Sequence, residues 1–469
     1  MTSQSRTPGA VASTAASVLS VLLTIVIGLL GPSAVVPALG GPSAGVSPHL
    51  AVGLAAAAIV LGGLGLLGGL VLGSRAGARA LVAFGGTAAA VLAFLPPSGS
   101  ADHLNYAAYG RMVTLGLNPY THGAADLPGD PIAAAVEAPW REEASVYGPV
   151  ATAVQALASW IGGDSLRVTI LVLALVNAAA FAGTGLLLDR FTRDDPARRL
   201  RAALLWTANP LLIYQLVAGM HIDTLAIACM VAALLARGRP AGSGALLGLG
   251  VAVKLNAGLV ALGPAWELRR RPGRLAVMAG VAVAVVAAGY ALAGPAALGP
   301  VTRTSKAVAH ASFWKSFQGF LQSVVGVGSA YRAEIQIGSV LVLVLLAWVM
   351  FRALPERDAL AVAAVLAVAY VFATPYILPW YDGLAFAMLA LAGASAVDRF
   401  AAGHLIVLSL AYLPARVEMQ PLDLEWLRLV VRQQVAPWAL LALTLGLAGW
   451  AWTTAARARR RPRPAAPRP

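Results

Sequence analysis

The chain has a single cysteine and few charged residues. Cys229 is the only cysteine among 469 residues, so no intrachain disulfide can stabilise the loops. Charged residues make up only 12% of the sequence, whereas hydrophobic residues make up 59%. This balance is far more apolar than a soluble domain needs to fill its core. The composition therefore excludes an ordinary soluble protein and favours a polytopic membrane protein.

Several motifs of soluble enzymes are also absent. The sequence has no Walker lysine motif, no HExxH zinc helix and no GxSxG nucleophile elbow, which argues against an ATPase, a zinc protease and a serine hydrolase. Gly63–Gly68 matches the dinucleotide fingerprint, but it lies inside an apolar segment, where close helix packing is the better interpretation. A substrate that is activated by attachment to a lipid phosphate would not require a nucleotide-binding pocket, which is consistent with these absences.

Apolar segments recur along the whole chain, from the N-terminus to about residue 452. A bilayer core requires roughly 20 apolar residues per helix. We predict an all-α membrane protein with about 12–14 transmembrane helices, forming one domain over residues 1–454. The Arg- and Pro-rich residues 455–469 are predicted to be a disordered cytoplasmic tail. The first helix is predicted to be a retained anchor, with a cleaved signal peptide as the alternative.

Arginine is concentrated in a subset of the loops. The loops and tail assigned to the cytoplasm, together with both termini, carry 23 of the 34 basic residues, as the positive-inside rule requires. The outer, periplasmic or extracellular face receives all three lysines, most acids and three unusual segments, at about 96–163, 294–331 and 413–435. We predict that these segments carry short surface helices and form a lid over the site. The tail is predicted to contact lipid headgroups, not nucleic acid.

Asp102 directly follows an apolar segment and therefore lies at a membrane exit. In glycosyl transfer to a hydroxyl, one carboxylate takes the acceptor proton and positive charge stabilises the departing phosphate. We therefore assign Asp102 as the catalytic general base. The alternative is a helix N-cap for the segment that follows. Its neighbour His103 is either a sugar contact or a solvated loop residue.

A second polar group lies in Gly219–Asp223, at a turn between two apolar segments. Asp223 either caps the following helix or binds sugar hydroxyls beside Asp102, together with His221. Lys254 lies in an apolar hairpin that we interpret as two short helices, where a cation costs on the order of 2.5–3.5 kcal/mol at mid-membrane. It therefore needs a partner, which is either a lipid phosphate or Asp223. These groups lack the local spacing of a metal site, so neither a metal nor a cofactor is predicted.

Basic and aromatic residues of the outer segments extend the predicted site. The basic group would close over the same phosphate, or else forms a solvated loop surface. It consists of Arg303, Lys306, His310 and Lys315. The aromatic group would stack on a sugar ring, or else belongs to a membrane-interface belt. It consists of Trp314, Trp380 and Tyr381, with Asp382 beside it.

From about Ser100 to Trp380 the sequence resembles the actinobacterial α-(1→6)-mannosyltransferases of the GT-C class that use polyprenyl-phosphate mannose. The resemblance is carried by Asp102–Gly110, Gly116–Tyr120, Tyr147-Gly-Pro149, Asn209-Pro-Leu211, Gly219–Asp223, Lys254 and Leu378–Asp382. It implies a GT-C-like bundle, with Tyr106, Asn118 and Tyr147 added to the substrate-binding residues. It also implies an inverting, metal-independent transfer of mannose, with Asp102 as base. Family members usually have His-Asn-Asp where this chain has His221-Ile-Asp223, a departure that bears on the sugar contacts and the acceptor.

The predicted function is therefore transfer of mannose at the outer face of the cell membrane. The expected partners are a polyprenyl-phosphate sugar donor, a growing mannan or lipoglycan acceptor and the lipid bilayer, with no nucleic acid. One alternative is a GT-C enzyme for another lipid-linked sugar, such as arabinose. Another is a transporter or flippase of a lipid-linked or small polar solute. Transporters usually carry internal repeats with broken helices at matching positions, and the sequence shows no such repeat.

Overall fold

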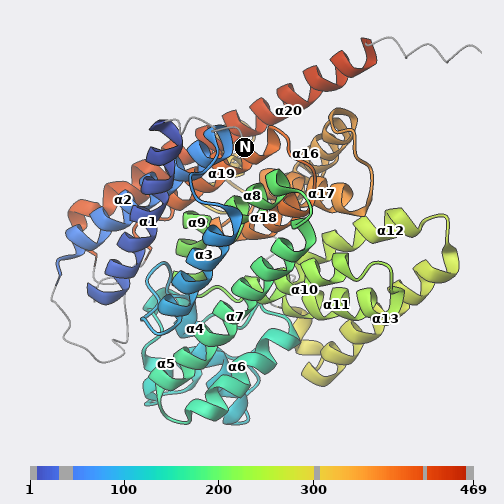
Figure 1. The fold of residues 1–469 in the computed structure, drawn as a ribbon. Coiled ribbons are helices and arrows are strands. Elements are labelled where there is room, and N and C mark those ends of the chain that lie inside the picture. Colours follow the sequence, from blue (N-terminus) through green and yellow to red (C-terminus); the bar gives the residue numbers. More distant parts are fainter. Residues whose placement is uncertain (1–7, 31–45, 300–306, 416–419, 461–469) are drawn as a thin grey trace, which may run out of the picture.

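The computed structural model describes residues 8–30, 46–299, 307–415 and 420–460. Within these ranges all regular secondary structure is helical, which confirms the predicted all-α class (Figure 1). The α-helices are α1 (Pro8–Leu30), α2 (Pro48–Leu72), α3 (Ala78–Ala93), α4 (Asp102–Thr114), α5 (Pro131–Ala134), α6 (Pro149–Gly162), α7 (Leu166–Thr192), α8 (Pro196–Leu205), α9 (Pro210–Leu212), α10 (Asp223–Leu235), α11 (Pro240–Val253), α12 (Leu262–Leu268), α13 (Pro272–Ala293), α15 (Phe313–Val324), α16 (Arg332–Ala353), α17 (Ala359–Ala373), α18 (Asp382–Leu391), α19 (Val397–Ala411) and α20 (Ala436–Arg460).

Shorter helical segments join these helices. Two of them are π-helical, η3 (Ile213–Ala218) and η8 (Leu427–Val435). The others are the 3₁₀ segments η1 (Ala124–Asp126), η2 (Ala138–Trp140), η4 (Leu255–Ala261), η5 (Pro295–Ala297), η6 (Pro379–Tyr381) and η7 (Leu422–Leu424). Many helices begin with proline, whose fixed φ and missing N–H suit the first helical position. In α2, for example, Ser47 Oγ also accepts the N–H of Leu50, so that the sequence specifies this helix start twice.

Six helical segments are long and apolar enough to cross a membrane. They are α1, α2, α7, α13, α16 and the stretch Leu422–Ala458, which includes η8 and most of α20. Four shorter apolar helices, α3, α10, α11 and α17, accompany them. The polytopic membrane fold is confirmed. The figure of 12–14 crossings stays a prediction, because the additional crossings would have to be made by shorter or interrupted helices.

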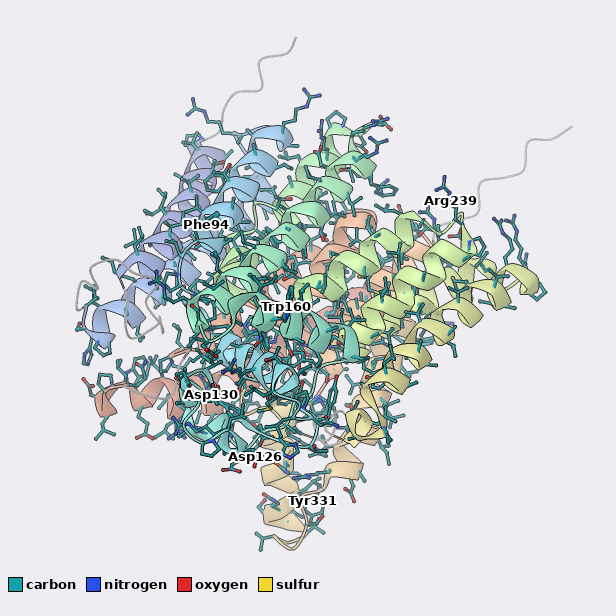
Figure 2. The ribbon with its side chains drawn as sticks, turned by 90° about the horizontal axis from the view of Figure 1, so that it is seen from below. Phe94, Asp126, Asp130, Trp160, Arg239 and Tyr331 are labelled. Carbon is teal, nitrogen blue, oxygen red and sulfur yellow. The ribbon has the colours of Figure 1, made fainter. Side chains whose placement is uncertain are left out.

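The arginine-bearing loops lie together at one end of the bundle. Arg201 pairs with Asp398, which joins α8 to α19. Arg274 Nη2 donates to the Gly238 carbonyl at 2.9 Å, which joins two further loops of the predicted cytoplasmic set. Figure 2 places Arg239 at one edge of the molecule, and Asp126 and Tyr331 toward the opposite edge. This segregation agrees with the charge asymmetry of the sequence, while the orientation in the membrane stays a prediction.

The three predicted outer segments do contain short helices. Residues 96–163 hold α4, α5 and α6, which gather at the lower side of Figure 1. Trp160 of α6 is 75% exposed, as a helix lying along a membrane surface would require (Figure 2). Residues 294–331 hold α15, and residues 413–435 hold η8. The predicted site residues Arg303 and Lys306 lie outside the described residues.

The C-terminal tail departs from the prediction. We predicted disorder from residue 455, but α20 continues to Arg460. Ala455–Arg460 consists of alanine and arginine, which are among the best helix formers. The first proline of the tail, Pro462, comes only afterwards. The prediction of disorder is therefore wrong for residues 455–460, which continue α20.

Candidate active site

The loop before α4 packs tightly against the turn before α10. The Ser98 N–H donates to the Ala218 carbonyl at 2.8 Å. At Gly99 a Cβ would lie 2.9 Å from the Tyr214 carbonyl oxygen and 3.2 Å from Gly219 Cα, so a side chain there would force the two segments apart. This close approach places Asp102, the first residue of α4, beside the turn that carries His221.

The turn itself has an unusual backbone. It follows the π-helical segment η3, and the His221 N–H donates to the carbonyl of Leu216, five residues earlier, at 3.1 Å. Asn177 Nδ2 donates to the same carbonyl at 2.7 Å. Met220 has a φ of 52°, which a residue with a side chain seldom adopts. π-helical turns and such strained residues are frequent at functional sites. The backbone of this turn therefore indicates a functional site.

His221 faces the Asp102 carboxylate. His221 Nδ1 lies 3.6 Å from Asp102 Oδ2, the imidazole is fully buried and the Asp102 side chain is 29% exposed. This distance is too long for a hydrogen bond. Neither ring nitrogen of His221 has a hydrogen-bond partner among the described residues, although the ring stacks on Trp380 with centroids 3.6 Å apart. Buried polar atoms without partners are rare, so this pair is typical of a site that completes its contacts with a ligand.

The two aspartates do not cap their helices. The N-cap positions of α4 and α10 are Ala101 and Ile222, and no side-chain cap hydrogen bond forms at either helix start. The alternative assignment of Asp102 and Asp223 as N-caps is therefore wrong. Ser100 Oγ instead accepts the Asp102 N–H at 3.1 Å, which leaves the carboxylate available for chemistry.

Lys254 forms an ion pair with Asp223. The predicted hairpin is confirmed, because α11 ends at Val253 and η4 and α12 follow Lys254. Lys254 Nζ also lies 4.1 Å from the centroid of the Tyr381 ring. Of the two partners considered for this cation, the structure therefore contains Asp223. The second carboxylate oxygen, Asp223 Oδ2, has no hydrogen-bond partner among the described residues.

Tyr147 approaches Lys254 because of the glycine that follows it. The Gly148 N–H donates to the Val253 carbonyl at 3.0 Å, and a Cβ on Gly148 would lie 2.2 Å from the Ala252 carbonyl oxygen. As a result, the Tyr147 ring centroid is 5.9 Å from Lys254 Nζ. The Tyr147 hydroxyl lies 3.1 Å from that of Tyr106 on α4. The missing side chain of Gly148 therefore permits the close approach through which Tyr147 links α4 to the hairpin that carries Lys254.

Burial tunes the two central groups in opposite directions. It raises the pKa of Asp102 to about 6, with smaller upward contributions from Asp223 and Glu137, against the opposing charge of Lys254. Burial also holds the pKa of His221 well below its usual value, aided by Lys254 and His103. His221 is therefore neutral, and it lies beside a carboxylate whose pKa is close to neutrality. This match between pKa and working pH suits a general base.

Two predicted contacts have side-chain oxygens that are already engaged with other residues. Asn118 Oδ1 accepts the Tyr120 N–H at 2.9 Å and so shapes a turn. Asp382 is buried and accepts a hydrogen bond from His404 Nδ1 at 2.8 Å. Asp382 directly follows η6, which carries Trp380. The geometry gives both residues a positioning role, and sugar contact by them stays a prediction.

The two predicted residues of α15 are likewise engaged with other residues. Trp314 is buried and donates from Nε1 to the Ala373 carbonyl at 2.7 Å. Lys315 Nζ donates to Gln318 Oε1 at 2.8 Å. His310 lies in the loop that precedes α15. His103, by contrast, is almost fully buried next to Asp102 in the chain, which excludes the solvated-loop alternative.

Several residues near the cluster were not predicted. Asn256 Nδ2 donates to the Tyr370 hydroxyl at 3.3 Å, close to Lys254 in the chain. Tyr412 packs edge-on against Trp380 with ring centroids 5.0 Å apart. Glu137 is also buried, and a buried carboxylate is rare enough to indicate a special role. None of these residues lies in a motif that sequence alone would single out.

Comparison with known proteins places this site in a family. The family model described as "Alpha-(1->6)-mannopyranosyltransferase, N-terminal domain" matches residues 9–271. Alpha-(1->6)-mannopyranosyltransferase A of Corynebacterium glutamicum is 26% identical over 361 residues, which cover 68% of this chain and 73% of the relative. The protein of the same name from Mycobacterium tuberculosis is 28% identical over 235 residues, or 48% of this chain and 45% of the relative. A probable alpha-(1->6)-mannopyranosyltransferase of Mycolicibacterium smegmatis is 31% identical over 146 residues, covering 30% of this chain and 26% of that protein.

The matched region is more than half of the chain, and it contains the residues that the fold brings together. Asp102, His221, Asp223 and Lys254 all lie within residues 9–271. An enzyme family of this kind also excludes the transporter alternative. This membrane protein is thus a glycosyltransferase, and it belongs to the alpha-(1->6)-mannopyranosyltransferase family.

Proposed function

We propose that the protein transfers mannose from polyprenyl-phosphate mannose to a hydroxyl of a mannan or lipoglycan, forming an α-(1→6) linkage. The names of the relatives support the sugar and the linkage. The observation that carries the proposal is the Asp102 carboxylate, held 3.6 Å from a buried, neutral His221 in an apolar surrounding. A lipid-linked donor fits a site that is built between membrane helices.

In the proposed reaction the acceptor oxygen attacks the anomeric carbon of mannose from the face opposite the phosphate. Asp102 takes the hydroxyl proton as the new C–O bond forms. The bond between the anomeric carbon and the phosphate oxygen breaks, and polyprenyl phosphate leaves with the electron pair. A single displacement inverts the anomeric carbon, so a β-linked donor gives an α-linked product. No metal ion takes part in this scheme.

His221 acts on Asp102 in this scheme as a positioning residue. A neutral imidazole can donate one N–H to the carboxylate and hold it toward the acceptor, provided the 3.6 Å separation shortens when substrate binds. Catalytic hydrogen bonds are often long in substrate-free enzymes and tighten in the complex. The Trp380 ring behind the imidazole prevents it from turning away.

The Asp223–Lys254 pair and the nearby tyrosines form the proposed sugar-binding wall. Together the pair is neutral, and the free oxygen Asp223 Oδ2 accepts a hydrogen bond from a sugar hydroxyl. The rings of Tyr147 and Tyr381 flank the ammonium group. Cation–π contacts stabilise Lys254 in the position that Asp223 requires.

The proposal is tested with purified protein in detergent, radiolabelled polyprenyl-phosphate mannose and a short α-mannoside acceptor. We expect label in the acceptor, an α-(1→6) linkage in the product and no loss of transfer in the presence of EDTA. GDP-mannose serves as the control donor and should give no product. Transfer from polyprenyl-phosphate arabinose but not from the mannose donor would show that the donor sugar is arabinose and not mannose. Transfer from GDP-mannose alone would contradict the proposal.

A further inference from the structure

Arg432 lies in the π-helical segment η8, outside every motif considered so far. Its Nε donates to the Ala411 carbonyl at 2.7 Å, and its Nη2 donates to the Tyr412 carbonyl at 2.8 Å. Its remaining nitrogen, Nη1, makes no hydrogen bond to the described residues, and no carboxylate among them pairs with the guanidinium. Arg432 is partly buried, and it lies on the outer segment just before the apolar helix α20. A cation held there without a carboxylate partner among the described residues is a functional-site hypothesis.

A chain of ring contacts joins Arg432 to the Asp102 site. The guanidinium carbon of Arg432 lies 5.5 Å from the centroid of the Tyr412 ring. Tyr412 in turn packs edge-on against Trp380, which stacks on His221. Ser100, whose Oγ accepts the Asp102 N–H, also lies near the Tyr412 side chain. Arg432 is therefore connected to the reaction site through Tyr412 and Trp380.

The basic residues around the site differ in whether their charge is already paired. Lys254 pairs with Asp223, and Arg428, one turn before Arg432, pairs with Glu425. Among the described residues no carboxylate pairs with Arg432, so its charge is available to an incoming anion.

The loop that precedes α15 adds positive character on the same side. The Ala309 N–H donates to the Pro375 carbonyl at 3.0 Å, which ties this loop to the segment before η6. The pKa of His310 is lowered by burial and then by the charges of Lys315, Arg432 and Arg428. These three basic residues therefore lie near the loop, although burial is the larger cause of the lowered pKa. An anion entering between the loop and η8 would meet these positive charges first.

We infer that Arg432 binds the phosphate group of the lipid-linked donor, through the N–H groups of Nη1. This inference rests on the proposed function, which requires a lipid phosphate, and it names the residue that receives it. Charge-assisted hydrogen bonds from a guanidinium to a phosphate are strong and directional. The carbonyls of Ala411 and Tyr412 hold the guanidinium in place before the donor arrives. Positive charge at this position stabilises the phosphate as it leaves.

A purely structural role is the competing explanation. Basic side chains often bind the last carbonyls of a helix, and Ala411 is the last residue of α19. The test must therefore separate phosphate binding from helix capping. Arg432→Gln is suited to this purpose, because glutamine keeps N–H donors for the carbonyls but has no charge. Arg428→Gln is the matched control, since Arg428 is on the same segment and is already paired.

The experiment measures binding of a short prenyl phosphate and of the corresponding prenol to purified protein, by tryptophan fluorescence, without a sugar or a transfer reaction. We expect the wild type to prefer the phosphate, and Arg432→Gln to lower the affinity for the phosphate about tenfold or more while the affinity for prenol is unchanged. Arg428→Gln should retain the wild-type preference. Equal losses for both ligands, or an unchanged preference in folded Arg432→Gln, would overturn the inference. A wild type that fails to distinguish phosphate from alcohol would count against the lipid-phosphate donor itself.

Discussion

Two pairs of polar side chains, one at the arginine end of the molecule and one at the candidate site, are held differently. At the arginine end, Arg201 Nε and Nη2 donate to the two oxygens of Asp398 at 2.6 and 2.7 Å, and Nη1 donates to the Ala392 carbonyl at 2.8 Å. Both side chains are buried, with 10% and 7% exposed. At the candidate site, Asp102 and His221 face one another at 3.6 Å without a hydrogen bond.

This difference distinguishes structure from function. A buried charge is tolerated when it is paired and its hydrogen-bonding groups are satisfied, which is true of Arg201 and Asp398. Polar groups left without partners destabilise the fold. Their presence at His221, Asp223 and Arg432 has no explanation in the stability of the substrate-free protein. A ligand that supplies the missing partners explains all three.

The largest expected effect is that of Asp102→Asn. The substitution keeps the shape of the side chain and removes its basicity, so we expect transfer to fall about 10³-fold. The thermal unfolding temperature should change little, because the Asp102 side chain does not cap α4. Asp164→Asn, at a carboxylate that is 84% exposed, is the control and should retain full activity. Near-wild-type transfer by folded Asp102→Asn would exclude this residue as the base.

Gly148→Ala should have a smaller effect on the same reaction. The added Cβ would lie 2.2 Å from the Ala252 carbonyl oxygen, so Tyr147 and Lys254 must separate. Small displacements of this kind reduce rates by roughly tenfold to a hundredfold, and the initial rate of labelled transfer measures the loss. Gly86→Ala is the matched control, because a Cβ there meets nothing within 4 Å. Equal activities of the two variants would show that the Tyr147–Lys254 contact is dispensable.

Asp398→Ala should leave the chemistry almost unchanged. Removing the carboxylate leaves the Arg201 guanidinium buried without its counter-ion, which costs about 3–5 kcal/mol of stability. We expect a clear decrease in the thermal unfolding temperature, with transfer per folded molecule close to wild type. A folded variant that has lost transfer while keeping its unfolding temperature would reverse the roles assigned to the two pairs.

The general fold and the central cluster were predictable from local features of the sequence. Hydropathy and the arginine pattern predicted the helical membrane bundle and its two unlike ends. Asp102 at the end of an apolar segment and Lys254 inside one were conspicuous, because each charge is costly where it stands. For both residues, the sequence immediately around the residue was sufficient for the prediction.

The remaining features depend on contacts between distant segments. No local pattern distinguishes Asp223 from a lipid phosphate as the partner of Lys254, since the two residues are 31 positions apart. Arg432 lies far from the matched motifs, and only the packing of Tyr412 against Trp380 brings it to the site. Trp314 was predicted to contact the sugar only because it is aromatic. The residue type does not reveal that its indole N–H donates to the Ala373 carbonyl.

The pH dependence of kcat/KM for labelled transfer tests the central claim most directly. Because burial raises the pKa of Asp102 to about 6, the base is protonated at lower pH and ionised above that value. The account predicts a plateau above about pH 6 and a tenfold fall for each unit below it, a limb that Asp102→Asn should lack. The phosphodiester of the donor stays ionised throughout this range and does not contribute. A rate that stays constant down to pH 5 would show that the essential carboxylate is an ordinary, solvated one, and would contradict the account.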